Sequence, residues 1–322
     1  MMVRFGIVGA KGIANKFARD IKYVDNAYIS AVAARNEFDA LKYQEIFQTE
    51  FAFSSYEALA KSDKIDAVYI ATPHNFHHSI VLMFLENRKH VLVEKPIALN
   101  YKEYEEIERK AIKNNVLLME AMWTLFLPAT TFVKNLLTLK TLGRVKKAEI
   151  TLGYQLPEHY PKDGRLLNKA LAGGSLLDLG IYPLSFYNFI KQYPIKILKA
   201  NAFMSDTGVD LKTEIEIVDA DDAVYLIKSS FMENLDNSAK FYCENGVIEM
   251  IDFSRSKSVF VNGEEHNFPF IDEGFAGEIK SFVDNIVNKE TENKIVTRKH
   301  MSETMKLIDK VKTLINLKYQ GE

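Results

Sequence analysis

A lysine follows directly on a stretch that is expected to form a buried strand. Residues 90–93 (HVLV) have the apolar pattern of such a strand, and Glu94-Lys95-Pro96 comes next. Pro96 cannot donate to a strand ladder, so the strand must end there. Parallel α/β sheets bind ligands at the carboxyl ends of their strands. Lys95 is therefore a candidate for binding or catalysis, and a solvated lysine without a role is the alternative.

A second group of reactive side chains lies in residues 173–183 (GGSLLDLGIYP). Ser175 and Asp178 have the spacing of a capping box, which predicts that a helix begins here. Asp178 and Tyr182 would then lie on one helix face. Hydride transfer at a carbonyl carbon needs a proton donor or acceptor at the oxygen, and a lysine cation lowers the pKa of a nearby tyrosine. Lys95, Asp178 and Tyr182 could supply that chemistry; the alternative is a helix cap and a half-buried aromatic ring.

A turn that contains glycine follows the first expected strand, at residues 4–8. In the dinucleotide-binding pattern G-x-G-x-x-G/A the chain supplies Gly9, Lys11 and Ala14, so the middle glycine is replaced. Its place between a strand and a helix predicts a pyrophosphate-binding turn, and a glycine-rich turn without a ligand is the alternative. The residues of this turn that we expect to contact the cofactor are Gly9, Ala10, Gly12 and Ile13.

The end of the second expected strand, at residues 29–34, indicates which dinucleotide is bound. NAD sites usually place an acidic residue there, whereas this chain has Ala34 followed by Arg35. A guanidinium group binds a 2′-phosphate bidentately, and a carboxylate would repel it. We therefore expect NADP rather than NAD, with both residues in the cofactor site. The alternative is a surface arginine at the end of a strand.

Residues 72–78 (TPHNFHH) follow the strand expected at 67–71. Three histidines in five residues could suggest a metal, but no acidic or thiolate partner is near in the sequence, and we expect none. We interpret this loop as a cover over the nicotinamide half of a cofactor. Together with the lysine motif it extends the expected cofactor-binding set by Thr72, Pro73, Asn75, His77, Glu94 and Lys95.

The secondary structure expected to position these residues differs between the first and the second part of the chain. Up to about residue 120, strands alternate with helices at 38–47, 56–61 and 77–86, which is typical of a doubly wound parallel sheet. From residue 197 to 261, successive strands with turns such as Asn245-Gly246 predict an antiparallel or mixed sheet. The predicted fold class is α/β, with a dinucleotide-binding domain at 1–122 and a second domain at 123–322.

The composition narrows the class of protein. A chain of 322 residues favours two domains, and a net charge of −2 gives no reason to expect nucleic acid or an anionic membrane as a partner. We find no run of 18 apolar residues and no leader pattern at the start. The single cysteine, Cys243, can form no internal disulfide and indicates a reduced, cytoplasmic compartment.

Taken together, these motifs resemble the glucose–fructose oxidoreductase / inositol 2-dehydrogenase (Gfo/Idh/MocA) superfamily. Beside residues 274–284, the stretches that carry the resemblance are GIVGA (6–10), ATPHNFHH (71–78), EKP (94–96) and GGSLLDLGIYPL (173–184). Within the superfamily, EAMW at 120–123 and Tyr182 are most similar to the branch of dimeric dihydrodiol dehydrogenases and NADP-dependent D-xylose dehydrogenases.

The resemblance implies an N-terminal Rossmann domain and a C-terminal α+β domain with a large open, mostly antiparallel sheet. It also implies a homodimer, or a tetramer, formed through that sheet, whose strands look apolar enough for an interface. It implies that Lys95 contacts the nicotinamide ribose and the substrate, that Tyr182 is the acid/base, and that Asp178 positions the reacting oxygen. One departure is Lys11 in the glycine turn, and another is Leu125, where this branch usually has arginine.

We therefore expect an NADP-dependent oxidoreductase that interconverts a secondary alcohol and a ketone on a sugar, polyol or cyclic diol. A glycoside hydrolase of the same superfamily is an alternative, which the missing acid at Ala34 disfavours. A non-catalytic NADP-binding sensor is another, which the joint presence of lysine, aspartate and tyrosine disfavours. The residues expected to line an apolar substrate pocket are Trp123, Leu125, Tyr154 and Phe275.

Overall fold

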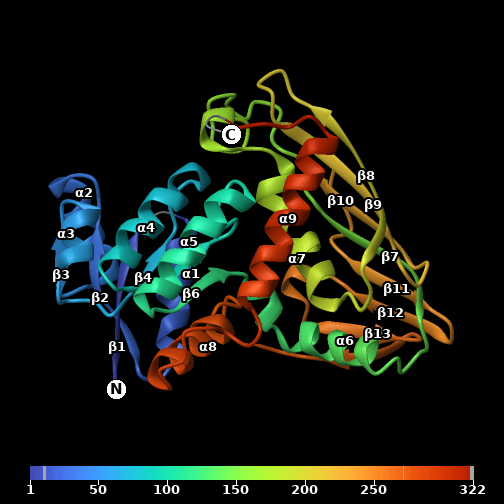
Figure 1. The fold of residues 1–322 in the computed structure, drawn as a ribbon, viewed down its shortest axis with the longest axis horizontal. Coiled ribbons are helices and arrows are strands. Elements are labelled where there is room, and N and C mark those ends of the chain that lie inside the picture. Colours follow the sequence, from blue (N-terminus) through green and yellow to red (C-terminus); the bar gives the residue numbers. More distant parts are fainter. Residues whose placement is uncertain (10–11, 271, 320–322) are drawn as a thin grey trace. The chain divides into compact units, whose positions relative to one another are not determined.

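The structure is a computed structural model that describes residues 1–9, 12–270 and 272–319. The chain forms two compact units (Figure 1). Unit 1 comprises Met1–Trp123 and Ile271–Ser302, and unit 2 comprises Thr124–Phe270 and Glu303–Glu322. The boundary expected after residue 122 lies one residue before the first crossing between the units, which follows Trp123. Residues 271–302 were expected in the second domain and instead belong to unit 1.

Unit 1 is built on a six-stranded sheet with the strand order β3-β2-β1-β4-β5-β6. Every neighbouring pair is parallel. The direction of winding reverses between β1 and β4, where Rossmann sheets bind dinucleotides. The strands are β1 (Val3–Val8), β2 (Ala27–Ala33), β3 (Phe51–Phe53), β4 (Ala67–Ile70), β5 (His90–Glu94) and β6 (Leu118–Ala121).

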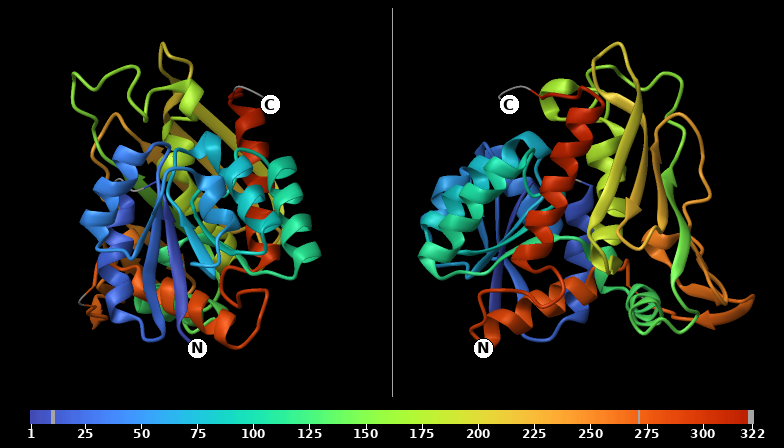
Figure 2. Two further views of the ribbon diagram at one scale, coloured as in Figure 1. Left: turned by 90° about the vertical axis from the view of Figure 1, so that its left-hand side faces the viewer. Right: turned by 45° about the vertical axis from the view of Figure 1, so that its right-hand side comes forward.

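Helices flank this sheet on both sides (Figure 2). They are α1 (Ile13–Asp20), α2 (Glu37–Phe47), α3 (Tyr56–Lys61), α4 (His77–Glu86), α5 (Tyr101–Asn114) and α8 (Ala276–Val287). Asn36, Ser55 and Asn100 begin α2, α3 and α5, because each side chain accepts a hydrogen bond from the backbone N–H three residues later. The helices predicted at 56–61 and 77–86 are confirmed at both ends.

Unit 2 is built on an eight-stranded open sheet with the order β14-β13-β12-β11-β7-β10-β9-β8. Its neighbouring pairs are antiparallel except β7 with β10. The predicted large, mostly antiparallel sheet is therefore confirmed. The strands are β7 (Val145–Gly153), β8 (Ile195–Met204), β9 (Asp210–Asp219), β10 (Val224–Ser230), β11 (Ala239–Cys243), β12 (Gly246–Met250), β13 (Ser258–Val261) and β14 (Glu264–Asn267).

Helix α7 (Ile181–Ile190) packs on one face of this sheet. Phe186 contacts Phe241 and Tyr187 contacts Tyr225, with 6.1 and 4.9 Å between ring centroids. Unit 2 also contains α6 (Pro128–Thr138) and most of α9 (Arg298–Leu314). In the described ranges of the chain, no helix is long and apolar enough to cross a membrane.

The opposite face of the unit 2 sheet carries charged side chains in cross-strand pairs. The pairs are Lys199 with Glu216, Lys228 with Glu214 and Lys240 with Glu249, at nitrogen–oxygen distances of 2.8, 3.8 and 3.5 Å. Their strand neighbours point to the helix-covered face and are apolar, for example Ile215 and Ile217. The outer face is therefore mixed, because strand β8 also exposes the apolar side chains of Ile197 and Phe203; its use as an interface stays a prediction.

Candidate functional site

The turn after β1 has the backbone geometry of a phosphate-binding turn. Gly9 has a φ of 85°, and a Cβ atom there would lie 2.5 Å from the carbonyl group of Ala71. Gly12 has a φ of 51°, with no other described atom within 4 Å of the position of a Cβ, and α1 begins at Ile13. Glycines at these two positions just before a helix N-terminus are typical of a turn that binds a phosphate group. Ala10, which we also expected in the site, lies outside the described residues.

Two polar atoms in the loop after β4 support the same assignment. Thr72 Oγ1 and Asn75 Oδ1 are buried, and in the described part of the chain they have no hydrogen-bond partner. Buried polar atoms are normally hydrogen-bonded. Thr72 and Asn75 follow the carboxyl end of β4, the strand that pairs with β1. The residues present therefore fit a dinucleotide, whose polar groups would supply the missing partners.

An exposed cation lies at the end of β2. Ala34 is buried and Arg35, the next residue, is exposed. The guanidinium group lies close enough to Tyr56 to affect the pKa of its phenol, which burial raises and the charge of Arg35 lowers in part. The end of this strand is where Rossmann domains bind the ribose of the adenosine half. Arg35 is thus exposed at this position, and its role as the 2′-phosphate ligand stays a prediction.

Two fully buried groups hold the segment after Lys95. The ring of His77 lies with Nδ1 2.7 Å from the Pro96 carbonyl oxygen and Nε2 2.9 Å from the Thr72 carbonyl oxygen. Glu120, at the end of β6, accepts a hydrogen bond from the Ile97 N–H at 2.8 Å. We expected His77 to contact the cofactor. Because it has no exposed surface, it instead joins the cofactor loop to the lysine segment.

Glu120 also affects the electrostatics of this segment. Burial raises the pKa of Glu120 to about 7, against the lowering effects of the Ile97 N–H and of the Lys95 charge. A carboxyl group that titrates near neutral pH therefore lies close to the candidate lysine. Glu94, just before the lysine, is buried and accepts a hydrogen bond from the Tyr69 hydroxyl. Sequence analysis missed the role of Glu120, although the residue belongs to the EAMW motif.

A further carboxyl group of unit 1 is buried in the first turn of α8. In the part of the chain that the structure describes, neither oxygen of Glu278 has a hydrogen-bond partner. Burial raises the pKa of Glu278 well above its ordinary value of 4.5, and the nearby carboxylates of Glu94 and Asp20 raise it further. The folded protein therefore keeps this carboxyl group protonated at pH values where the unfolded chain does not.

We expect Glu278→Gln to stabilise the protein at neutral pH. Because the folded pKa is raised, wild-type stability falls as pH rises from 4.5 towards the folded pKa. An amide cannot ionise, so the variant should gain about 1–3 kcal/mol in unfolding free energy at pH 7 and much less at pH 5. Denaturant unfolding at both pH values measures the difference. Glu45→Gln, at an exposed position of α2, is the control. An equal gain at pH 5 and pH 7 would contradict the assignment.

Asp210 of β9 fixes the start of the second reactive segment. Its Oδ2 accepts hydrogen bonds from the Ser175 hydroxyl and the Leu176 N–H, both at 2.7 Å. Ser175 makes no helix-capping hydrogen bond with its side chain, so the predicted capping box is wrong. A π-helical turn, Leu176–Gly180, contains Asp178 and leads into α7. Such turns are frequent at functional sites, and Tyr182 follows as the second residue of α7.

Asp178 is paired with Arg165, a residue that sequence analysis did not single out. Arg165 Nη1 lies 2.7 Å from Asp178 Oδ1. The backbone beside Arg165 lies against Gly173, where a Cβ would lie 2.7 Å from the Arg165 carbonyl oxygen. Gly174 has a φ of 115°, and a Cβ there would lie 2.3 Å from Asp210 Oδ1. Gly173 thus allows the backbone of Arg165 to approach, and Gly174 allows the carboxylate of Asp210 to approach. Arg165 lies in a loop without periodicity, so no sequence signal marked it.

The four residues expected to line a substrate pocket differ in exposure. Tyr154 is 40% exposed, whereas Leu125 and Phe275 are fully buried. Trp123 is also buried and stacks on Phe275, with 5.3 Å between ring centroids. Leu125 and Phe275 therefore present no surface to a ligand in this structure, and only Tyr154 has the exposure that a pocket-lining residue needs.

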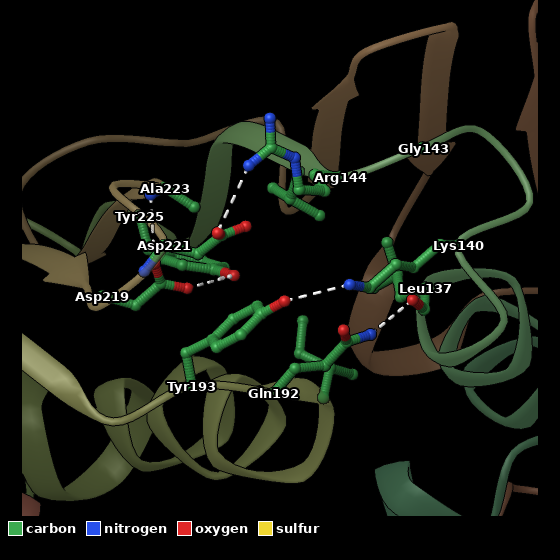
Figure 3. Close-up of a pocket in the computed structure, with 12 residues that line it drawn as sticks. Leu137, Lys140, Gly143, Arg144, Gln192, Tyr193, Asp219, Asp221, Ala223 and Tyr225 are labelled. Carbon is green, nitrogen blue, oxygen red and sulfur yellow. Dashed lines mark hydrogen bonds and ion pairs between the residues drawn. The ribbon is translucent and has the colours of Figure 1, made fainter.

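A separate pocket of unit 2 lies near the C-terminal end of α7 (Figure 3). Its polar groups are largely paired with one another. Lys140 donates to the Tyr193 hydroxyl at 2.9 Å, and Arg144 contacts Asp221 at 3.4 Å. Tyr182 lies in the first turn of α7, at the opposite end of the helix, so this pocket is not where Tyr182 would act. Among the described residues no cluster of histidine, cysteine, aspartate or glutamate could hold a metal ion.

Comparison with known proteins agrees with this geometry. Residues 3–122 match the model of the oxidoreductase family with an NAD-binding Rossmann fold, and residues 131–249 match the GFO/IDH/MocA C-terminal domain. The chain is 34% identical over 277 residues to trans-1,2-dihydrobenzene-1,2-diol dehydrogenase of Xenopus laevis, which covers 83% of this chain and 81% of that protein. It is 30% identical over 339 residues to the scyllo-inositol 2-dehydrogenase (NADP(+)) IolU of Bacillus subtilis (strain 168), covering 100% and 99% of the two chains.

A solved structure supports the fold. KijD10, a 3-ketoreductase from Actinomadura kijaniata in complex with NADP and TDP-benzene, superimposes with a TM-score of 0.88 at 21% identity over 98% of both chains. The predicted fold class is confirmed, and so is the predicted class of enzyme, an NAD(P)-dependent oxidoreductase that acts on a hydroxyl group. With both of its family domains matched, the chain belongs to the Gfo/Idh/MocA oxidoreductase family.

Proposed function

We propose that the protein is an NADP-dependent oxidoreductase that interconverts a secondary alcohol and a ketone on a sugar, polyol or cyclic diol. The observation that carries the proposal is that both reactive segments are held by buried groups. His77 and Glu120 hold the segment of Lys95, and Asp210 holds the segment of Asp178 and Tyr182. The relatives named above act on a ring-borne diol and on an inositol, which are substrates of this kind.

The residues of the chain have separate roles in the proposed reaction. The nicotinamide, when bound, supplies the acceptor or the donor of the hydride. Tyr182 takes the proton of the substrate hydroxyl during oxidation and returns it during reduction. The ammonium group of Lys95 stabilises the negative charge that develops on the reacting oxygen. Asp178, whose orientation is set by Arg165, accepts a hydrogen bond from the substrate.

A screen of polyols tests this function. Purified protein is mixed with NADP⁺ and a panel of sugars, inositols and cyclic diols, and the formation of NADPH is followed by its absorbance. We expect turnover with at least one member of the panel. Release of a chromogenic aglycone from glycosides without net NADPH formation would overturn the proposal in favour of a hydrolase. Binding of NADPH without turnover of any member would favour a sensor.

Arg35→Ala should change the choice of cofactor. The variant loses a charge-assisted bidentate contact with the 2′-phosphate, so we expect NADPH affinity to fall about 10- to 100-fold while NADH affinity changes little. Fluorescence titrations with NADPH and NADH in parallel measure both affinities. Arg109→Ala, which removes an exposed arginine from α5, is the matched control. Unchanged discrimination in Arg35→Ala would contradict the assignment of the 2′-phosphate site. An NADP-named relative, IolU, supports the same cofactor.

We also propose that two copies associate through the outer face of the unit 2 sheet. The lysine–glutamate pairs on that face are of mixed sign, so two copies could exchange partners across a two-fold axis. Such an interface would weaken with salt, and the mass in solution at low and high ionic strength tests it. A cytoplasmic location remains a prediction from the single cysteine.

A further inference from the structure

The ion pair between Arg165 and Asp178 presents a donor and an acceptor side by side. The two side chains meet at 2.7 Å, and their exposed fractions differ: 46% for Arg165 and 10% for Asp178. The carboxylate is sheltered, whereas the guanidinium reaches solvent. Only one of its nitrogens is engaged by an acceptor in the described part of the chain. The other N–H groups of Arg165 are therefore available to a ligand that approaches Asp178.

The position of the arginine is determined by its surroundings. Gly174 donates its N–H to the Leu166 carbonyl oxygen at 2.9 Å, which fixes the backbone next to Arg165. Burial lowers the pKa of Arg165, but the carboxylate of Asp178 raises it by more. Tyr160 and Tyr154 raise this pKa further. Tyr154 is the exposed residue among those expected to line the substrate pocket. The guanidinium thus pairs with the carboxylate of the proposed reaction, and the exposed Tyr154 lies near enough to influence it.

This arrangement matches two hydroxyl groups on adjacent carbons. A hydroxyl group can donate one hydrogen bond and accept others. The hydroxyl group next to the reacting one can donate to the carboxylate of Asp178 and accept from the guanidinium group of Arg165, which leaves the proton of the reacting hydroxyl to Tyr182. A lone alcohol would leave this pair without a ligand. If it displaced water from the N–H groups of the arginine, it would not replace their hydrogen bonds, which is costly.

We propose that Arg165 is a specificity-determining residue that binds the hydroxyl group on the carbon next to the reacting one. The protein then requires a vicinal diol for oxidation, or an α-hydroxyketone for reduction. This inference rests on the proposed oxidoreductase function. It adds the feature of the substrate that Arg165 recognises, which is the second hydroxyl group. A salt bridge that only orients Asp178 would show no such preference.

Matched substrates test the proposal with the full chain. Oxidation by NADP⁺ is measured for trans-cyclohexane-1,2-diol and scyllo-inositol, and for cyclohexanol, which lacks the second hydroxyl. In each case a hydride leaves the carbinol carbon for NADP⁺ and the hydroxyl proton leaves to the protein. We expect wild-type kcat/KM for a diol to exceed that for cyclohexanol by about 100-fold or more. Arg165→Gln should lower kcat/KM for the diol about 10- to 100-fold, mainly through KM, and change the value for cyclohexanol by less than about twofold.

Controls separate this role from a structural one. Arg165→Lys keeps a positive charge near Asp178 but lacks the planar fork, so it should restore only part of the preference. Lys162→Gln removes an exposed cation from the same loop, where it pairs with Asp206, and should leave both rates unchanged. Thermal unfolding and NADPH titration confirm that Arg165→Gln is folded and binds cofactor.

Three results would overturn the inference. The first is an equal loss of rate on diol and lone alcohol in Arg165→Gln, which would limit the arginine to orienting Asp178. The second is a wild-type enzyme that oxidises cyclohexanol as well as the diols, which would remove the requirement for the second hydroxyl. The third is NADPH binding with no oxidation of diol or alcohol. That result identifies failure of the proposed function itself, and the inference fails with it.

Discussion

Tyr182→Phe should abolish most turnover and leave cofactor binding almost unchanged. The substitution removes one hydroxyl group and keeps the ring that packs at the start of α7. General acid–base catalysis contributes about 10²- to 10⁴-fold, so we expect kcat for the best diol to fall by that factor. The Kd for NADPH should stay within about twofold of wild type, because the residues proposed to bind the cofactor belong to unit 1. Steady-state rates and fluorescence titration measure the two quantities.

Tyr187→Phe is a matched control for this prediction. Tyr187 lies on the same helix, is fully buried, and its hydroxyl has no partner among the described residues. Its removal deletes a desolvated polar group without a compensating bond, so the variant should be active and at least as stable as wild type. A Tyr182→Phe enzyme with wild-type kcat would exclude the tyrosine as the proton carrier.

Lys95→Met should be the other severely impaired variant. Methionine keeps an unbranched apolar side chain at the end of β5 and removes the ammonium group that the proposed reaction uses at the oxygen. We expect kcat/KM to fall about 10²-fold or more, because electrostatic stabilisation of developing charge and proton transfer both depend on that group. Rates across the pH range with the best diol measure the loss.

The surroundings of Lys95 make this test specific. His77 and Glu120 bind the backbone after the lysine, at Pro96 and Ile97, so the segment should keep its course in the variant. Lys61→Met removes an exposed lysine that pairs with Glu57 on α3, and should have no effect on rate. If Lys95→Met turned over the best diol at the wild-type rate, the lysine would have no part in the chemistry.

Both reactive segments are held in place by groups that take no part in the proposed reaction. In unit 1 these groups are an imidazole and a carboxyl group, and in unit 2 they are the carboxylate of Asp210 and two glycines. Preorganised side chains lose little entropy when a substrate binds, which is a general source of catalytic rate. Substitutions at the supporting positions should therefore affect turnover more than cofactor affinity, although none of them contacts the substrate in our proposal.

Local pattern by itself determined most of the parallel sheet and its helices. Strand and helix periodicities in the first 120 residues depend on neighbours in sequence, as does the N-cap at Ser55. The position of Lys95 after a strand could also be predicted from the sequence, because Pro96 ends the strand independently of the rest of the fold. The short β3 was not predicted, since three residues show no alternation. Helix α5 was not named either, although its buried residues Tyr104, Ile107 and Ala111 recur at helical spacing.

Tertiary structure decided which groups share a site. Asp210 lies 35 residues beyond Ser175, and it replaces the local capping box because a buried carboxylate can satisfy both the hydroxyl and the next N–H. Arg165 pairs with Asp178, 13 residues further along the chain, and Gly173 leaves room for the Arg165 carbonyl oxygen. Alternation along the strands of unit 2 predicts that one face of the sheet is apolar. The packing of α7 on that face decides that the lysine–glutamate pairs lie on the other face. Contacts between residues distant in sequence have no local signature, so patterns of period 2 or 3.6 could not predict them.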